Sequence, residues 1–407
     1  MAIGTFVSLA QPNYRKFFAG QAVSLIGTWI QSVAMAWLVL EISGSAASIG
    51  LAVAFQFLPV LVFGPYGGVL VDRFNKRKLL LVTQCLAGLQ ATLLAILVLT
   101  DHASIGLVLA LSLMLGFIYV LDMPARQAFV REMVPPELVR NAVSLNSVVI
   151  NGARIVGPAL AGVMIATIGL GWCFAVNAAS FVAVIAAYAS MKGDLLFPSE
   201  PVERAPGQLR EGLRYVWRTP DLRVPLIMMS VVGMLAYEFQ VVLPAFTAET
   251  FHGDALSLGV ISAAMGVGAV IGGLVSASRQ TSGIKAIALA SAVFGLAILV
   301  TALMPSVIWA SIAMIPVGAA SVWFTSAGNS AVQLHTDPQM RGRVMSLWTV
   351  AFIGSTPIGA PIVGWIAETA GPRWALGVGA AAALAAGLYG ARWAARMHRA
   401  TAATPAI

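Results

Sequence analysis

The sequence predicts an all-α membrane protein with twelve membrane-spanning helices in two six-helix bundles. Of its 407 residues, 59% are hydrophobic and only 10% are charged, whereas a soluble domain carries about 25% charged residues. Long apolar stretches recur along the whole chain, which excludes a disordered chain and a soluble domain with a single anchor. Only helices and closed barrels span a bilayer, and continuous apolar runs favour helices over the alternating strands of a barrel.

Twelve stretches approach the length of about 20 apolar residues that a span needs. In the first half we expect spans at Phe17–Leu40, Ser48–Val71, Leu79–Thr100, Ile105–Leu121, Ala142–Ile168 and Trp172–Met191. In the second half we expect them at Val224–Thr247, Leu256–Ser278, Ile284–Met304, Ile308–Ala327, Val344–Ala367 and Trp374–Ala395.

A charged, proline-containing segment separates the two halves. It predicts three parts: a bundle over residues 1–191, a cytoplasmic central loop over 192–223 and a second bundle over 224–407. Within the loop, Gln208–Arg218 is predicted to form an amphipathic surface helix, with Leu209, Leu213 and Val216 on one side.

The basic residues orient the spans. With the amino terminus inside, all but two of the 24 Lys and Arg residues fall in inner loops, in tails or at the inner ends of spans; Arg373 falls outside and Arg154 lies deep within a span. Because inner loops of membrane proteins are enriched in Lys and Arg, we expect a multi-pass protein of the cell (inner) membrane with both termini cytoplasmic. The net charge of +8 is then explained by the surplus of Lys and Arg on one face of the lipid bilayer. We therefore expect the bilayer, and no nucleic acid, as a partner.

An internal repeat relates the halves. A gapless offset of 202 residues matches Gly152, Gly157 and Gly162 with Gly354, Gly359 and Gly364, and Gly169 and Trp172 with Gly371 and Trp374. Each copy follows an even number of spans, so the repeat is parallel. Transporters are often built from such repeats, with the substrate site between them; chance matching in an Ala/Gly-rich sequence is the alternative.

The loop after the second span carries a motif formed by Gly68, Asp72, Arg73, Lys76 and Arg77. It resembles the signature of the major facilitator superfamily, with Asn75 in place of the usual glycine. The resemblance implies the major facilitator fold and a loop that latches the cytoplasmic gate. The alternative is an ordinary basic inner loop that contains one acid.

Span five contains Gly152, Gly157, Pro158 and Gly162, which resembles the Gly-Pro motif of the exporting, antiporter-type branches of that superfamily. The region from Tyr119 to Gly162 is similar to the branch of enterobactin-type siderophore exporters and macrolide efflux proteins. These resemblances imply outward transport. The alternative for the glycines is plain helix packing, since small residues let helices approach closely.

Two charges fall at mid-membrane depth. Arg154 lies 14 residues beyond Arg140, about 21 Å along a helix, and Glu238 lies at a similar depth, 15 residues beyond Arg223. Such charges are costly and usually face a cavity or a partner. We expect Glu238 to carry a coupling proton and Arg154 to tune Glu238 or hold an anionic substrate; a structural ion pair or a snorkelling side chain is the alternative. Asp122, at the inner end of span four near Arg126, is a further coupling candidate, with a role in the gate or in capping as the alternative.

Polar and aromatic residues within the spans are candidates for lining a substrate cavity. These are Gln31, Asn151, Tyr237, Gln240, Trp323 and Trp348. The sequence has no phosphate-binding loop, no metal-binding spacing and no catalytic triad, so we expect neither a cofactor, nor a metal, nor an enzyme.

These observations predict a secondary active transporter that acts as a monomer. It would export a small drug- or siderophore-like organic molecule by alternating access, against inward proton flow. A lysolipid flippase or a small-molecule importer of the same fold is the alternative. From other classes, a membrane-embedded transferase would need a polar catalytic cluster, and a nontransporting receptor or scaffold would not need the charges at Arg154 and Glu238.

Overall fold

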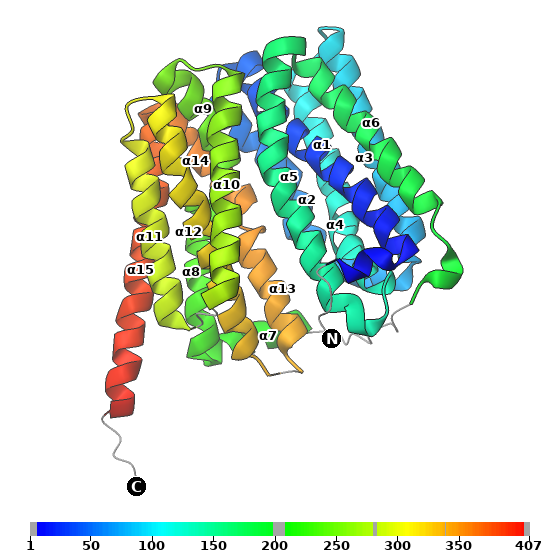
Figure 1. Ribbon diagram of the computed structural model, residues 1–407. Coiled ribbons are helices and arrows are strands. Elements are labelled where there is room, and N and C mark those ends of the chain that lie inside the picture. The colour runs from blue at the N-terminus through cyan, green and yellow to red at the C-terminus, as the bar shows by residue number, and fades with distance from the viewer. Residues whose placement is uncertain (1–5, 198–207, 280–282, 338, 403–407) are drawn as a thin grey trace. The chain divides into compact units, whose positions relative to one another are not determined.

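The computed structural model describes residues 6–197, 208–279, 283–337 and 339–402, and these residues form helices and connecting turns without a strand (Figure 1). Among the described residues, twelve helical segments are long and apolar enough to cross a membrane, as the sequence predicts. The prolines of the predicted central loop, Pro198, Pro201 and Pro206, lie outside the described residues.

The chain divides into two compact units, which we call unit 1 and unit 2. Unit 1 comprises residues 1–44, 55–204 and 254–263, and unit 2 comprises 45–54, 205–253 and 264–407. The start of the second span therefore clusters with unit 2 and the start of the eighth span with unit 1. The division into parts 1–191, 192–223 and 224–407 stays a prediction.

The first six spans are single helices joined by short turns. Their bounds are α1 Pro12–Ser43, α2 Ala46–Arg73, α3 Lys76–Leu99, α4 Ile105–Glu132, α5 Val139–Ile168 and α6 Leu170–Ala189; the 3₁₀ turns are η1 Val7–Ala10, η2 Pro136–Leu138 and η3 Gly193–Leu195. Helix α4 continues well past the predicted end at Leu121.

The remaining spans include two that are assembled from shorter helices. Their bounds are α7 Gln208–Arg218, α8 Pro220–Ala236, α9 Phe239–Ala245, η4 Phe246–Thr250, α10 Ala255–Arg279, α11 Ile284–Ala302, α12 Val307–Leu334, α13 Arg341–Phe352, α14 Thr356–Ala370 and α15 Pro372–Ala402. The seventh span comprises α8, α9 and the π-helical turn η4, and the eleventh comprises α13 and α14.

The pairing of helices supports the predicted repeat. In unit 1, α1 packs on α5 and α6, and α3 packs on α4 and α6. In unit 2 the equivalent spans pair in the same way: α8 packs on α13, α14 and α15, and α11 packs on α12 and α15. The turns agree as well, because Gly169 and Gly371, matched by the 202-residue offset, both adopt positive φ (+91° and +101°), which favours glycine.

Two repeat-related crossings bring backbones into contact. A Cβ on Gly162 of α5 would lie 2.9 Å from the carbonyl oxygen of Ala255, at the start of α10. A Cβ on Gly364 of α14 would lie 2.7 Å from the carbonyl oxygen of Ala46, at the start of α2. The first crossing lies in unit 1 and the second in unit 2. Glycine is needed at both because any side chain would displace backbone.

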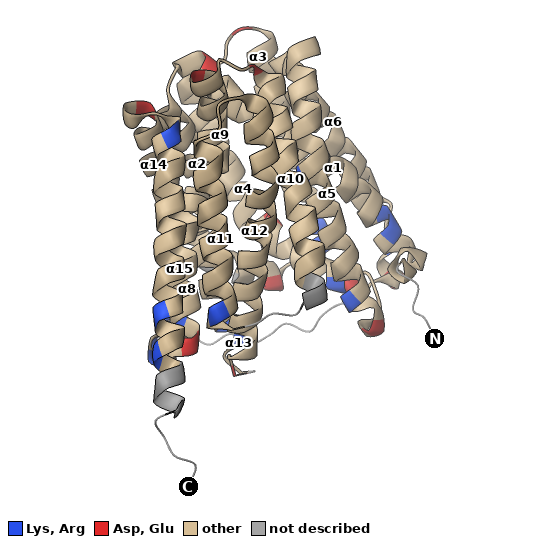
Figure 2. Cartoon of the chain, turned by 60° about the vertical axis from the view of Figure 1, so that its left-hand side comes forward, with Lys and Arg blue, Asp and Glu red and all other residues tan. Residues whose placement is uncertain are grey.

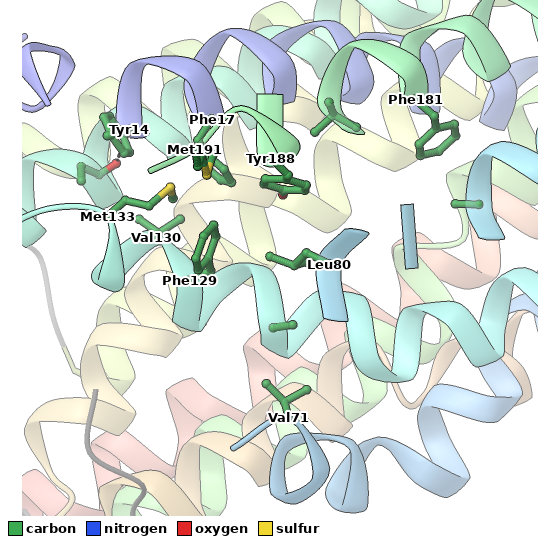
Figure 3. Close-up of a cluster of buried hydrophobic side chains, with 14 of the residues drawn as sticks. Tyr14, Phe17, Val71, Leu80, Phe129, Val130, Met133, Phe181, Tyr188 and Met191 are labelled. Carbon is green, nitrogen blue, oxygen red and sulfur yellow. Dashed lines mark hydrogen bonds between the residues drawn. The ribbon is translucent and has the colours of Figure 1, made fainter. Parts of the chain in front are cut away.

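A cluster of buried aromatic and aliphatic side chains packs the helices of unit 1 together near the start of α1 (Figure 3). The rings of Phe17 and Phe129 both lie about 6 Å from the ring of Tyr188. The Tyr14 hydroxyl donates a 2.7 Å hydrogen bond to the carbonyl of Ala142, so this phenol joins α1 to α5 without leaving a polar atom unsatisfied.

Candidate functional site

The seventh span is interrupted at Tyr237 and Glu238. Helix α8 ends at Ala236 and α9 begins at Phe239, with ψ values of 4° and 40° at the two intervening residues. The backbone amides of Val241 and Val242 donate to the carbonyl of Glu238 and restart the helix. The predicted span Val224–Thr247 thus lies within the span Pro220–Thr250, which consists of two helices and a π-helical turn. Discontinuous helices at membrane depth are typical of transporter binding sites.

The eleventh span is interrupted beside it, between Phe352 and Thr356. Pro357 stands at the start of α14, where its missing N–H leaves no hydrogen bond unmade. The Ser355 hydroxyl donates to the carbonyls of Ala351 and Phe352, both at 3.0 Å. Gly233 of α8 packs against this break, since a Cβ there would lie 3.0 Å from the carbonyl oxygen of Ala351.

Glu238 lies buried between these two breaks. Its side chain is 4% exposed and hydrogen-bonds with the side chain of Thr356. Its Oε1 atom is buried and has no hydrogen-bond partner among the described residues. A buried polar atom without a partner is costly, and such atoms often mark function. Glu238 is thus a carboxyl group with one oxygen anchored and one available.

Tyr237 is the other residue of the break between α8 and α9. Its hydroxyl donates a 2.7 Å hydrogen bond to the carbonyl of Ser321 in α12. Its ring centroid lies 5.1 Å from Phe294 and 5.2 Å from Phe352. Three neighbouring helices therefore fix this side chain, which makes it a rigid support for the Glu238 backbone.

In unit 1, Arg154 lies over the ring of Trp29. The guanidinium carbon is 5.3 Å from the ring centroid, a cation–π distance, and both side chains are half-buried. Trp29 and Tyr237 each lie 17 residues after the proline that begins their helix, and Arg154 is matched by the repeat offset with Thr356. Each unit thus has a polar residue of its fifth span, Arg154 or Thr356, in contact with a residue of its first span.

Asp122 belongs to a buried network rather than standing alone. Its Oδ1 accepts from Thr83 at 2.8 Å and from Gln84 at 2.7 Å, and its Oδ2 pairs with Arg126. Arg126 also contacts Gln21, which donates to the Tyr188 hydroxyl at 2.9 Å. The network joins α1, α3, α4 and α6 around one paired charge.

The loop motif is folded back onto unit 1. Lys76 pairs with Glu132 at 2.8 Å, with side chains 11% and 9% exposed. Arg77 donates to the carbonyls of Tyr188 and Ala189 at 2.8 and 2.7 Å, which satisfies the last turn of α6. Asn75 caps α3 by accepting from the amide of Lys78.

Asp72 is half-buried and lines a pocket of about 530 Å³ together with Lys76, Arg77 and Glu132, while Arg73 is exposed. Close helix packing involves Gly67, the neighbour of the predicted Gly68. A Cβ on Gly67 would clash with the carbonyl oxygen of Val120 in α4.

The glycines of the span-five motif have different environments. A Cβ on Gly157 would strike the side chain of Trp29, and Gly162 contacts the start of α10, whose Gly259 approaches the Pro158 carbonyl. A Cβ on Gly152, in contrast, would meet nothing within 4 Å. Close packing is therefore a property of Gly157 and Gly162.

The other cavity candidates separate into packed and accessible side chains. Gln31 is buried, donates to Gln90 at 3.0 Å and accepts from Asn177 at 2.8 Å, inside the α1–α3–α6 core. Trp348 is 5% exposed and packs against Gly328. The half-buried candidates are Asn151, Gln240 and Trp323.

Comparison with known proteins identifies the family. The sequence model of the family described as "Transmembrane secretion effector" matches residues 3–406. The chain belongs to this family of the major facilitator superfamily.

Two relatives of this major facilitator protein have names that state the compound they transport. It is 26% identical over 355 residues to the enterobactin exporter EntS of Shigella flexneri, covering 87% of this chain and 84% of the exporter. It is 23% identical over 359 residues to the staphyloferrin A transporter of Staphylococcus aureus, covering 87% and 89% of the two chains. The chain is therefore a multi-pass membrane transporter of a small molecule, not an enzyme.

Solved structures share the fold. The peptide transporter POT in complex with sulfate superimposes with a TM-score of 0.76 at 15% identity, over 95% of both chains. A bacterial homologue of the iron transporter ferroportin, in an inward-facing state, gives a TM-score of 0.74 at 13% identity, over 94% of this chain and 98% of that one. Identities this low carry the fold alone.

Two residues of this major facilitator chain were not predicted from the sequence. Thr356 is the partner of Glu238, and Trp29 is the partner of Arg154. The repeat offset already linked Thr356 with Arg154 and was the available signal. Among the described residues, no group of three His, Cys, Asp or Glu side chains has the arrangement of a metal site.

Proposed function

We propose that this major facilitator protein exports a siderophore- or drug-like small organic molecule and is driven by inward proton flow. The names of the relatives, an enterobactin exporter and a staphyloferrin A transporter, support the direction and the substrate class. The protein works as a monomer in the cell (inner) membrane. Both termini lie in the cytoplasm, because Lys and Arg are enriched in the tails and in the loops on the same side, as is typical of cytoplasmic segments.

The observation that carries proton coupling is the environment of Glu238. A proton carrier in a membrane must be buried, must gain and lose a proton without dismantling its surroundings, and must lie in a segment that can move. Glu238 is buried, has one partner-free carboxyl oxygen and lies at a helix break. Its Oε1 can take a proton without breaking a contact.

Asp122 meets these requirements less well. Thr83, Gln84 and Arg126 occupy both of its oxygens, so binding a proton would break a contact. We assign Asp122 and Arg126 to holding the helices of unit 1 together, and the coupling role to Glu238.

Arg154 is assigned to the substrate. Its guanidinium is a fixed positive charge with planar donors suited to carboxylate or similar anionic oxygens, and contact with Trp29 orients it. Among the cavity candidates, the half-buried Asn151, Gln240 and Trp323 complete the proposed substrate surface. Gly68, Asp72, Arg73, Lys76 and Arg77 form the cytoplasmic gate during alternating access.

Transport from proteoliposomes tests this function. Vesicles are loaded with enterobactin, staphyloferrin A or a macrolide, and efflux is followed with an acidic exterior, with and without an ionophore that collapses the pH gradient. We expect faster efflux of at least one siderophore with the gradient and slower efflux without it. Efflux that is unchanged on collapse would exclude proton drive, and no movement of any compound would exclude this substrate class.

A further inference from the structure

Helix α7 combines a docked face with an exposed basic and apolar face. In unit 2, Glu211 pairs with Arg343 at 2.6 Å, and the Tyr215 hydroxyl donates to Asp337 at 3.0 Å. Val216 is 3% exposed, and a Cβ on Gly212 would lie 3.1 Å from Cβ of Arg343. These residues attach α7 to α13 and to the end of α12, and the helix lies across the helix ends of its unit (Figure 1).

The opposite face presents five exposed side chains to the surroundings. Leu213 is 54% and Trp217 61% exposed, and Arg210, Arg214 and Arg218 are exposed as well. At 100° per residue, all five fall within about 140° of the helix circumference. Glu211, whose side chain is 61% exposed, lies at the edge of this face and pairs with Arg343 of α13.

The position of α7 in the chain places this helix next to a membrane-spanning segment. The spanning segment begins at Pro220, two residues after α7 ends at Arg218. In unit 2, Lys and Arg gather at this same end of the helices (Figure 2). The guanidinium carbon of Arg223 lies 5.9 Å from the ring centroid of Trp217, and the guanidinium also donates to the Trp217 carbonyl. These contacts orient the indole in the absence of a ligand.

We propose that α7 is an anchor for anionic lipid, with Arg210, Arg214 and Arg218 binding lipid phosphates and Leu213 and Trp217 entering the acyl boundary. Charge complementarity selects this occupant, because three outward arginines beside an exposed indole match an anionic headgroup layer. Basic amphipathic helices bind such surfaces, and each Lys or Arg near the surface strengthens the attraction. The position of α7, and of α13 and α8 that pack against it, would then depend on the fraction of anionic lipid in the membrane.

An environment-sensitive fluorophore at Leu213→Cys tests the anchor, in full-length protein whose Cys85 and Cys173 are replaced by alanine. The protein is reconstituted into phosphatidylcholine vesicles with increasing fractions of phosphatidylglycerol. We expect a blue shift of emission as the anionic fraction rises. The shift should disappear in about 1 M salt, where the Debye length is about 3 Å.

Two matched variants separate α7 from general charge effects. Arg210→Gln/Arg214→Gln and Arg392→Gln/Arg396→Gln remove the same charge at the same spacing, the second pair from exposed positions of α15. We expect the first variant to need a several-fold higher phosphatidylglycerol fraction for half the shift, and the second to behave like the parent. An emission independent of lipid charge, or an equal effect of both variants, would overturn the proposal.

Discussion

Glu238 contacts Thr356 at the level where the helices that carry these two residues are both interrupted. The two breaks place a carboxyl group, a hydroxyl group and helix ends in one buried location of unit 2. In two uninterrupted helices the backbone N–H and C=O groups would all be hydrogen-bonded within each helix. The interruptions therefore make this location polar.

The first prediction concerns proton coupling. Glu238→Gln keeps the size of the side chain and its contact with Thr356 but cannot titrate. We expect the variant to bind substrate and to exchange it across the proteoliposome membrane, while losing acceleration by a pH gradient. The measurement is efflux with and without the gradient, compared with wild type at equal protein content.

Glu249→Gln is the matched control, because Glu249 is an acid of the same span that lies in η4, away from the break at Glu238. We expect this variant to keep its response to the gradient. If Glu238→Gln responds fully, Glu238 is not the carrier, whatever the control does.

The second prediction concerns the α5–α10 crossing. Gly162→Ala places a methyl group 2.9 Å from the Ala255 carbonyl oxygen, and overpacking of this kind typically costs about 1–3 kcal/mol. Gly152→Ala, in the same helix, meets open space and should gain about 0.5–1 kcal/mol from better helix propensity. Thermal unfolding in detergent should therefore move in opposite directions for the two variants. Equal shifts would show that Gly162 does not need its close contact.

The third prediction concerns the ion pair of the loop motif. Because Lys76 and Glu132 are only about a tenth exposed, Lys76→Met or Glu132→Gln alone leaves a largely buried charge, which costs about 3–5 kcal/mol in a buried pair. The double variant should lose less than the sum of the two single variants. Denaturant unfolding of the four proteins measures the coupling. The exposed Glu137→Gln should change stability little, and strict additivity at the pair would contradict a direct interaction.

The sequence predicts the fold because the number of spans depends only on the lengths of apolar runs. It predicts helix ends less well, and α4 shows why. Asp122 suggests an end near Leu121, but Thr83, Gln84 and Arg126 satisfy the carboxylate, so the helix continues to Glu132. Whether an acid ends a span depends on neighbours from other helices.

The candidate site is predictable in its charges and not in its contacts. Arg154 and Glu238 stand out because charges are rare within the spans. The breaks beside Glu238 and Thr356 leave little trace, since an apolar run is the same for a straight and for an interrupted helix. The contact of Glu238 with Thr356 requires α8 and α14 to approach closely, which Gly359 permits by lying against the Met234 carbonyl.

The fourth prediction concerns the start of α10. Asp254 precedes this helix, and its Oδ1 accepts from the amide and the hydroxyl of Ser257 at 2.9 and 2.8 Å. These hydrogen bonds stabilise the carboxylate and lower the pKa of Asp254 below its usual value. Asp254→Ala should reduce stability by about 1 kcal/mol at neutral pH, as expected for loss of an N-cap.

The pH dependence of this cap follows from the sign of the shift. Because the pKa of Asp254 is lower in the folded protein than in the unfolded chain, the charged cap contributes fully above the unfolded value of about 3.9. Its contribution is lost as the pH falls through the folded value. Unfolding in detergent across this range should therefore show the difference between wild type and Asp254→Ala narrowing in acid. Asp254→Asn keeps an acceptor at every pH, so it should match wild type at neutral pH and exceed it in acid. A constant difference between wild type and Asp254→Ala would mean that the carboxylate charge has no part in capping α10.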